Sequence, residues 1–135
     1  MKVLLDTNVL VSAVATRGLC ADILQTVIAR HQLLVGPTVR AEVGRVLRDK
    51  FRVPEAVARE FETFLRREAT TTPRAGGPHP AVRDPDDALV LAEAVVGGAE
   101  VLVTGDRDLL DVVEPPMPIL TPRAFWEQLR AADAE

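Results

Sequence analysis

The chain has a single cysteine, Cys20, among its 135 residues. One cysteine excludes an internal disulfide and a Cys-x-x-Cys metal clip, so we expect a reducing compartment, the cytoplasm. No stretch approaches the roughly 18 uninterrupted apolar residues of a membrane helix, and we expect no membrane association. Asp6 and Asn8 interrupt the apolar start of the chain, which argues against a signal peptide.

Serine and histidine are also scarce. Ser12 is the only serine, and His31 and His79 stand in no recognisable relation to it, which argues against a Ser-His-Asp hydrolase. The sequence has neither a GxGxxG motif nor a P-loop, so it supports neither a dinucleotide site nor a P-loop nucleotide site. Hydrophobic residues make up 47% and aromatic residues 4%, as in a globular protein with an aliphatic core. We expect residues 1–135 to form one domain.

The net charge of −4 argues against indiscriminate binding to a polyanion, because neutralisation of phosphates dominates such affinity. The charge is nevertheless uneven along the chain. Residues 38–74 carry nine basic and six acidic side chains, and the remaining residues carry seven and fourteen. Mixed charge that keeps helix faces solvated explains most of these side chains.

Short apolar runs alternate with helical patterns along the chain. Strands that alternate with helices imply right-handed crossovers and a mostly parallel sheet covered on both faces. The sequence therefore predicts an α/β fold, a three-layer α/β/α domain with a parallel sheet of four or five strands. We expect strands at 3–5, 33–35, 70–72, 101–103 and 119–120, and helices at 8–15, 19–30, from 37, from 54, 85–96, 108–113 and from 122.

Two carboxylates directly follow predicted buried strands. Asp6 follows the strand at 3–5, and Asp106 follows the strand at 101–103 after Thr104 and Gly105. Ligands of open α/β sheets gather outside the carboxyl ends of the strands, so two neighbouring strands would bring both acids to one crevice. Taken singly, each acid fits a helix or turn cap equally well.

Two further acidic positions lie in predicted helices. Glu42 lies near the apolar positions Val39 and Val46, where a carboxylate is costly unless it is paired or bound to metal; a first-turn acid favoured by the helix dipole is the alternative. Asp84 and Asp87 imitate a capping box and fit a purely structural role. Three acids in residues 84–87 exceed what capping requires, however, and repel one another without a cation nearby.

Carboxylates that converge at one edge favour a divalent cation. Oxygen ligands without histidine or cysteine favour Mg²⁺ or Mn²⁺ over zinc, and such ions commonly serve phosphoryl chemistry. The Asp6-Thr7-Asn8 stretch also has the spacing of a Mg²⁺-dependent phosphatase motif. Asn8 replaces the second acid of that motif, which makes aspartyl-phosphate chemistry the weaker enzyme interpretation.

Four motifs in register resemble the PIN-domain nucleases. They are DTNVLVSA at 6–13, Glu42 beyond the second strand, RDPDD at 83–87 and VTGDRDLL at 103–110. They are most similar to the VapC-like ribonucleases, the toxin components of type II toxin–antitoxin systems. The resemblance implies a sheet in the order 3-2-1-4-5, a Mg²⁺ or Mn²⁺ cofactor and hydrolysis of RNA phosphodiester bonds. It also implies a homodimer and an antitoxin partner, while a PIN-like module that binds RNA or protein without cleavage remains the alternative.

The resemblance assigns roles to residues by position. Basic residues between 40 and 74 become candidates to hold the RNA backbone. The catalytic and metal-binding residues implied are Asp6, Glu42, Asp87 and Asp106, the supporting residues are Asn8, Asp84, Thr104 and Asp108, and the RNA-binding candidates are Arg45, Arg48, Lys50 and Arg52.

Overall fold

A five-stranded parallel sheet forms the centre of the protein, in a computed structural model that describes residues 1–134. Its strand order is β3-β2-β1-β4-β5, which confirms the predicted fold and the order implied by the resemblance. The strands are β1 (Lys2–Leu5), β2 (Gln32–Val35), β3 (Thr70–Thr71), β4 (Val101–Val103) and β5 (Ile119–Leu120). The helices are α1 (Thr7–Ala15), α2 (Leu19–Arg30), α3 (Pro37–Asp49), α4 (Glu55–Glu68), α5 (Pro85–Val96), α6 (Arg107–Leu110) and α7 (Pro122–Ala134).

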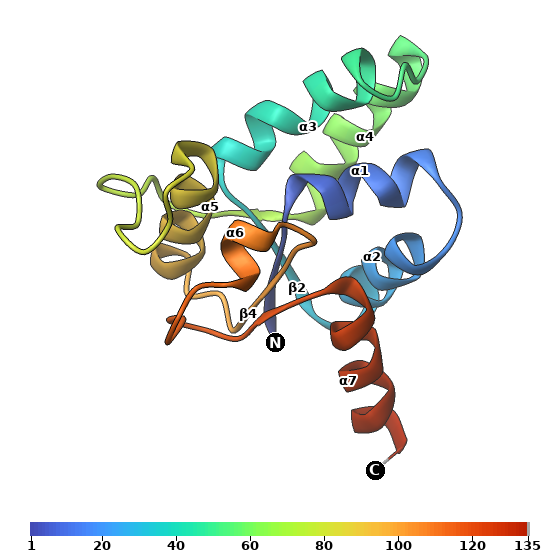
Figure 1. The fold of residues 1–135 in the computed structure, drawn as a ribbon. Coiled ribbons are helices and arrows are strands. Elements are labelled where there is room, and N and C mark those ends of the chain that lie inside the picture. The colour runs from blue at the N-terminus through green and yellow to red at the C-terminus, as the bar shows by residue number, and fades with distance from the viewer. Residues whose placement is uncertain (135) are drawn as a thin grey trace.

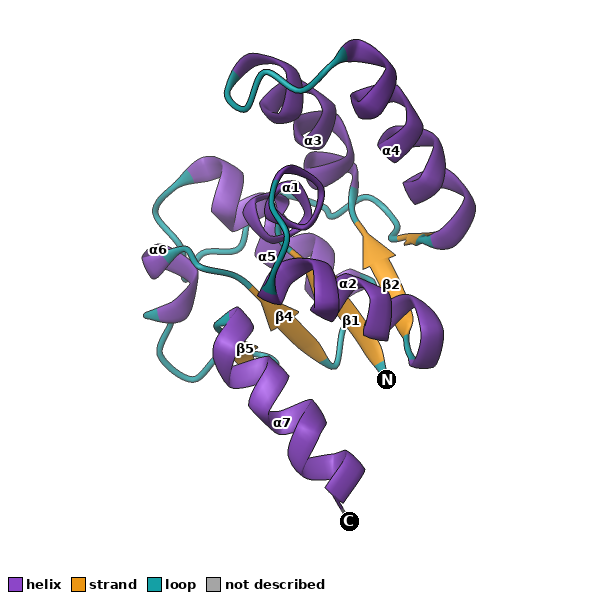
Figure 2. Cartoon of the chain, turned by 90° about the vertical axis from the view of Figure 1, so that its right-hand side faces the viewer, coloured by secondary structure: helices purple, strands orange, loops and turns teal. Residues whose placement is uncertain are grey.

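Helices lie on both sides of the sheet, as three layers require. In Figure 1, α5 lies on one side of the strands and α2 and α7 on the other, and α1, α3 and α4 lie above them. Figure 2 shows β2, β1 and β4 side by side, with their arrowheads towards the end where α1 and α3 begin. All strands therefore deliver their carboxyl ends to one edge of the sheet.

The central strand β1 is continuously apolar because both of its faces are covered. Val3, Leu4 and Leu5 are at most 1% exposed, as expected for a strand buried in a parallel sheet. Leu4 pairs with Leu34 on one side and with Leu102 on the other. This register brings the ends of β1 and β4 together, so the residues that follow them become neighbours.

Helix α6 is shorter than the sequence predicts. It spans Arg107–Leu110, whereas residues 108–113 were expected to be helical. Asp111 is its C-cap, and the backbone N–H of Val112 turns back to the carbonyl of Leu109. Beyond the cap, Val113 is 84% exposed and Glu114 has a φ of 50°, so the backbone has left the helical conformation before the predicted end.

Helices α3 and α4 form a hairpin that is closed by ion pairs. The Arg48 guanidinium on α3 lies 2.7 Å from carboxylate oxygens of both Glu55 and Glu62 on α4. A Cβ at Gly44 would overlap the Glu62 carboxylate, so glycine permits this close approach. The apolar side of α4 (Ala58, Phe61 and Leu65) is buried within the chain.

Helices α1 and α2 pack against each other at the start of the chain. No single helix among residues 1–134 combines the length and the apolar character of a membrane span. Taken together, α1 and α2 meet both criteria as a pair bent by 107°.

Candidate functional site

Three helices at the carboxyl edge of the sheet begin with an aspartate as N-cap. Asp6 caps α1, where its Oδ1 accepts a 2.7 Å hydrogen bond from the backbone N–H of Thr7. Asp84 caps α5 by accepting from the N–H groups of Asp86 and Asp87, each at 3.0 Å. Asp106 caps α6 by accepting from the N–H of Asp108 at 2.9 Å. The positive ends of three helix dipoles therefore support the acidic charge at this edge.

Thr104 connects the acids at the ends of β1 and β4. It is fully buried, and its Oγ1 donates a 2.8 Å hydrogen bond to Oδ2 of Asp6. The same oxygen accepts from the backbone N–H of Asp106 at 3.0 Å. Both carboxylate oxygens of Asp6 are thus held in place, in a residue that is only 5% exposed.

Glu42 reaches the same edge from α3. The hydroxyl of Thr7 donates a 3.0 Å hydrogen bond to Oε2 of Glu42, which fixes the side chain towards the start of α1. Burial raises the pKa of Glu42, the Thr7 hydrogen bond lowers it, and the charges of Asp86 and Asp6 raise it. The Glu42 carboxylate lies near the apolar residues of α3 and is stabilised there by the hydroxyl of Thr7 from α1.

The charges of the acids interact most strongly at Asp87. Burial, the charge of Asp106 and a hydrogen bond to the Asp106 carboxylate together raise the pKa of Asp87 to about 7. Asp84 and Asp6 add to this repulsion. Burial also raises the pKa of Asp6, partly offset by Thr104 and Thr7. Burial is thus the largest cause of the raised pKa at both residues, and neighbouring carboxylates add to it.

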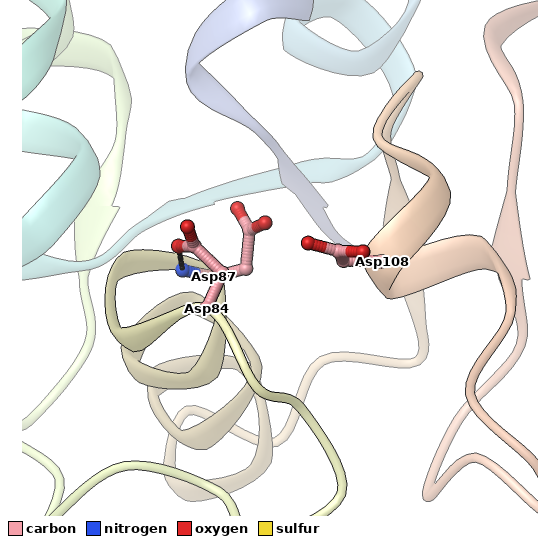
Figure 3. A group of neighbouring side chains, drawn as sticks. All are labelled: Asp84, Asp87 and Asp108. Atoms are coloured by element: carbon pink, nitrogen blue, oxygen red, sulfur yellow. Dashed lines mark hydrogen bonds between the residues drawn. The ribbon is translucent and has the colours of Figure 1, made fainter.

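The carboxylates of Asp84, Asp87 and Asp108 face one another across a small gap (Figure 3). Asp84 and Asp87 come from the start of α5 and Asp108 from α6, and one oxygen of each lies within 4.8 Å of the others. The structure therefore joins two residues expected in supporting roles, Asp84 and Asp108, directly to Asp87. Asp106 and Asp6 interact with Asp87 of this group through charge, and the charge of Asp6 also acts on Glu42.

The remaining residues singled out in the sequence lie in different surroundings. Asn8 is exposed on α1, and no hydrogen bond within residues 1–134 joins its amide to the acids. Arg45 lines a cleft with Glu42, whereas Arg48 is held in ion pairs by α4. Lys50 lies 5.9 Å from the ring centroid of Phe51, and Arg52 is exposed in a left-handed conformation with φ of 52°.

Glu93 was not singled out by sequence reasoning, although it is the one charged residue in the apolar part of α5. It is 4% exposed, and its two carboxylate oxygens accept from the backbone N–H (2.9 Å) and the hydroxyl (2.5 Å) of Thr38. It therefore supplies to α3 the side-chain cap that Gly36 lacks. A lone acid on an otherwise apolar helix was the signal that could have pointed to this role.

The donor set at this edge fits a hard divalent cation. All the acidic side chains offer oxygen, and raised pKa values at Asp6, Glu42 and Asp87 mark a site that a cation would neutralise. Asp87, Asp84 and Asp108 lie close enough to share one ion.

Comparison with known proteins identifies the family of the chain. The sequence profile described as a PIN domain matches residues 2–108. No curated protein matches the chain. Among solved structures, VapBC2 from Rickettsia felis bound to a promoter DNA fragment superposes with a TM-score of 0.67 and 14% identity, covering 90% of this chain and 98% of that chain.

Two other solved structures share the fold. PAE2754 from Pyrobaculum aerophilum has a TM-score of 0.67 and 22% identity, covering 97% of this chain and 90% of that one. The PIN domain of RRP44 from T. brucei has a TM-score of 0.54 and 18% identity, covering 98% and 82%. The profile match covers most of the chain and includes every acid of the four motifs, which decides the family. The chain belongs to the PIN-domain family.

Proposed function

We propose that the chain is a Mg²⁺- or Mn²⁺-dependent endoribonuclease. The observation that carries this proposal is the convergence of Asp6, Glu42, Asp87 and Asp106 on one edge of the sheet, where the pKa of Asp87 rises to about 7. Membership of the PIN family supports it. A bound divalent ion would activate water for in-line attack on a phosphodiester and stabilise the leaving oxygen.

The chain's own residues divide the work in this proposal. Asp6, Asp87 and Asp106 would hold the cation; Asp106 is hydrogen-bonded to Asp87, and Asp84 and Asp108 each place an oxygen within 4.8 Å of an Asp87 oxygen. Glu42 orients a water or a second ion: Thr7 occupies its Oε2, and no hydrogen bond from residues 1–134 reaches its Oε1. Thr104 keeps the Asp6 carboxylate facing the site.

The central experiment replaces Asp6 with asparagine. The amide side chain keeps an oxygen for the N–H of Thr7, so the fold should persist, but the substitution removes the charge that holds the cation. We expect Mg²⁺-dependent cleavage of RNA by the folded variant to fall at least a hundredfold. Asp22→Asn on the exposed side of α2 is the matched control and should cleave like the wild type. Undiminished cleavage by Asp6→Asn would contradict the catalytic role assigned to Asp6.

Metal binding separates this proposal from a non-catalytic PIN-like module that binds RNA or protein. Calorimetric titration of Mn²⁺ into the wild type at neutral pH should give a binding isotherm that Asp6→Asn weakens. No measurable Mn²⁺ binding would favour the non-catalytic module. Cleavage of RNA in preference to a small phosphate ester would distinguish the nuclease from the weaker phosphatase alternative.

We further propose that the protein is the toxin of a toxin–antitoxin pair and acts as a homodimer in the cytoplasm. The similarity in fold to a VapBC2 complex supports a protein partner. Expression of the chain alone should arrest growth, and co-expression with the neighbouring open reading frame should relieve the arrest. Light scattering measures whether the purified chain is dimeric. Growth unaffected by an active nuclease would contradict the toxin role while leaving the catalytic proposal intact.

A further inference from the structure

A cleft of about 570 Å³ lies beside the acidic residues, between α3, α5 and the segment that follows β3. We call it the α3–α5 cleft. Its lining combines three acids (Glu42, Asp86 and Glu93, the last hydrogen-bonded to Thr38), two arginines (Arg45 and Arg74) and an apolar surface. A volume of this size is typical of sites for small organic groups. The cleft is continuous with the proposed catalytic site because Glu42 belongs to both.

The two arginines of the cleft are available to a ligand. Arg45 and Arg74 are exposed, and neither takes part in an ion pair within residues 1–134. Arg48, on the next turn of α3, is held by two glutamates instead. In a chain of net charge −4, affinity for a polyanion must come from such local positive groups.

Helix geometry sets where Arg45 lies relative to the acids. Glu42 and Arg45 are three residues apart on α3 and therefore share a face, separated by about 4.5 Å along the helix axis. A phosphodiester held at the acids would therefore bring an adjoining nucleotide of the same strand to Arg45. Guanidinium groups suit this role because their fork of donors matches phosphate oxygens.

Hydrogen bonds hold the wall of the cleft together, and its buried acid, Glu93, already has hydrogen-bond partners. Glu93 and Thr38 both line the cleft, and their two hydrogen bonds join α5 to the first turn of α3. Pro37, Ala41 and Leu89 add apolar surface next to the arginines. This combination suits a nucleotide, whose base presents an apolar face and whose phosphate is an anion.

We propose that the α3–α5 cleft binds the nucleotide next to the cleaved bond of a single-stranded RNA. Arg45 and Arg74 contact the phosphates, and Leu89 and its apolar neighbours contact the base or ribose. Single-stranded RNA is favoured because an unpaired base can turn into a cleft that a paired base cannot enter. This inference rests on the proposed ribonuclease function and adds to it a substrate-binding surface.

Binding of a fluorescein-labelled single-stranded RNA, followed by anisotropy, tests the proposal. The Asp6→Asn background keeps the RNA intact during the measurement. Adding Arg45→Ala with Arg74→Ala should weaken binding about tenfold and lower the slope of log K against log salt by about 1.4, because each lost phosphate contact contributes about 0.7. The matched control, Arg17→Ala with Arg123→Ala, removes the same charge from exposed positions outside the cleft and should change binding less than threefold.

The kinetics of cleavage give an independent readout. With Asp6 intact, the Arg45/Arg74 double variant should raise KM about tenfold while kcat changes less than threefold. Equal losses in the cleft and control variants would overturn the proposed cleft but leave the ribonuclease standing. Unchanged RNA binding by the cleft variant would also overturn the proposed cleft. It would indicate that the two arginines bind an acidic protein segment instead. If the wild type neither binds nor cleaves RNA, the proposed function itself fails.

Discussion

The hydroxyl of Thr104 donates a 2.8 Å hydrogen bond to the Asp6 carboxylate across 98 residues of sequence. The bond joins the ends of two neighbouring strands, β1 and β4, and Thr104 also accepts from the N–H of Asp106. One buried hydroxyl thus fixes an acid on each side. The geometry of the acidic site depends on this threonine as much as on the acids.

Replacing Thr104 with valine keeps the shape of the side chain and removes both hydrogen bonds. We expect the free energy of unfolding to fall by about 1–3 kcal/mol, because a carboxylate and a backbone N–H lose a buried partner. Metal affinity should fall as well, since Asp6 loses its orientation. Urea denaturation and Mn²⁺ titration measure the two effects. Thr26→Val on α2 removes only a part-exposed bond to the carbonyl of Asp22 and should change neither.

Replacing Glu93 with alanine removes the cap of α3 that comes from α5. We expect a loss of about 2 kcal/mol or more in unfolding free energy, because the N–H and hydroxyl of Thr38 lose their acceptors. Glu93→Gln keeps one carbonyl oxygen and should lose less. Glu127→Ala, exposed on α7, is the control for removal of an acid. Equal stability of all three variants would contradict a capping role.

Gly36 leaves the space that Glu93 fills. A Cβ at this position would overlap the Glu93 carboxylate, although the φ of −88° suits any residue. Gly36→Ala should therefore destabilise the fold by about 1–3 kcal/mol through steric overlap alone. In a double-mutant cycle, Gly36→Ala should cost less once Glu93 is alanine, because the overlapping carboxylate is gone, although the Cβ of residue 93 at 2.9 Å remains. Gly76→Ala, where a Cβ meets open space, is the control; additive effects in the cycle would rule out the contact.

The pKa of Asp87 predicts how stability depends on pH without metal. The folded-state pKa of about 7 lies above the ordinary value of 3.8, so the folded protein binds more protons than the unfolded chain between these values. Stability from this group is full below about pH 4 and is lost as the pH rises through 7. The raised pKa values of Asp6 and Glu42 act in the same direction.

Thermal melting in EDTA checks this dependence. Asp87→Asn should melt above the wild type at pH 8, and the difference should close by pH 5, where Asp87 is already protonated. Comparing the two proteins isolates Asp87 from the other titrating groups. A Tm difference that stays constant from pH 5 to 8 would refute the raised pKa.

The fold could be predicted from the sequence largely because its signals are local. The Asp84-Pro85 start of α5 and the apolar run of β1 each depend on a few adjacent residues, and both lie where they were expected. The strand order came instead from the family resemblance, since pairing of β1 with β4 joins residues about a hundred positions apart. The predicted length of α6 was wrong because the sequence does not show that Val113 stays exposed, which only the final packing decides.

The site was harder to predict, because partners from distant elements decide what each side chain does. Arg45 and Arg48 look equivalent in sequence, yet Arg48 meets two glutamates of α4 and Arg45 borders the cleft. The question of cap or ligand at Asp6 also had no single answer in the sequence. In the structure Asp6 is a cap through one oxygen, and the other faces Thr104.

The acids of this site differ in how they affect stability, because some of them also cap helices. Active-site charges commonly lower stability, so removing them often stabilises a protein at the expense of function. Asp87 fits this rule, since its neighbours repel its charge. Asp84, three residues earlier, does not, because its carboxylate holds two backbone N–H groups. In a lineage that lost the proposed nuclease activity, changing Asp87 would raise stability, whereas changing Asp84 would lower it. Substitutions should therefore accumulate at Asp87 well before they appear at Asp84.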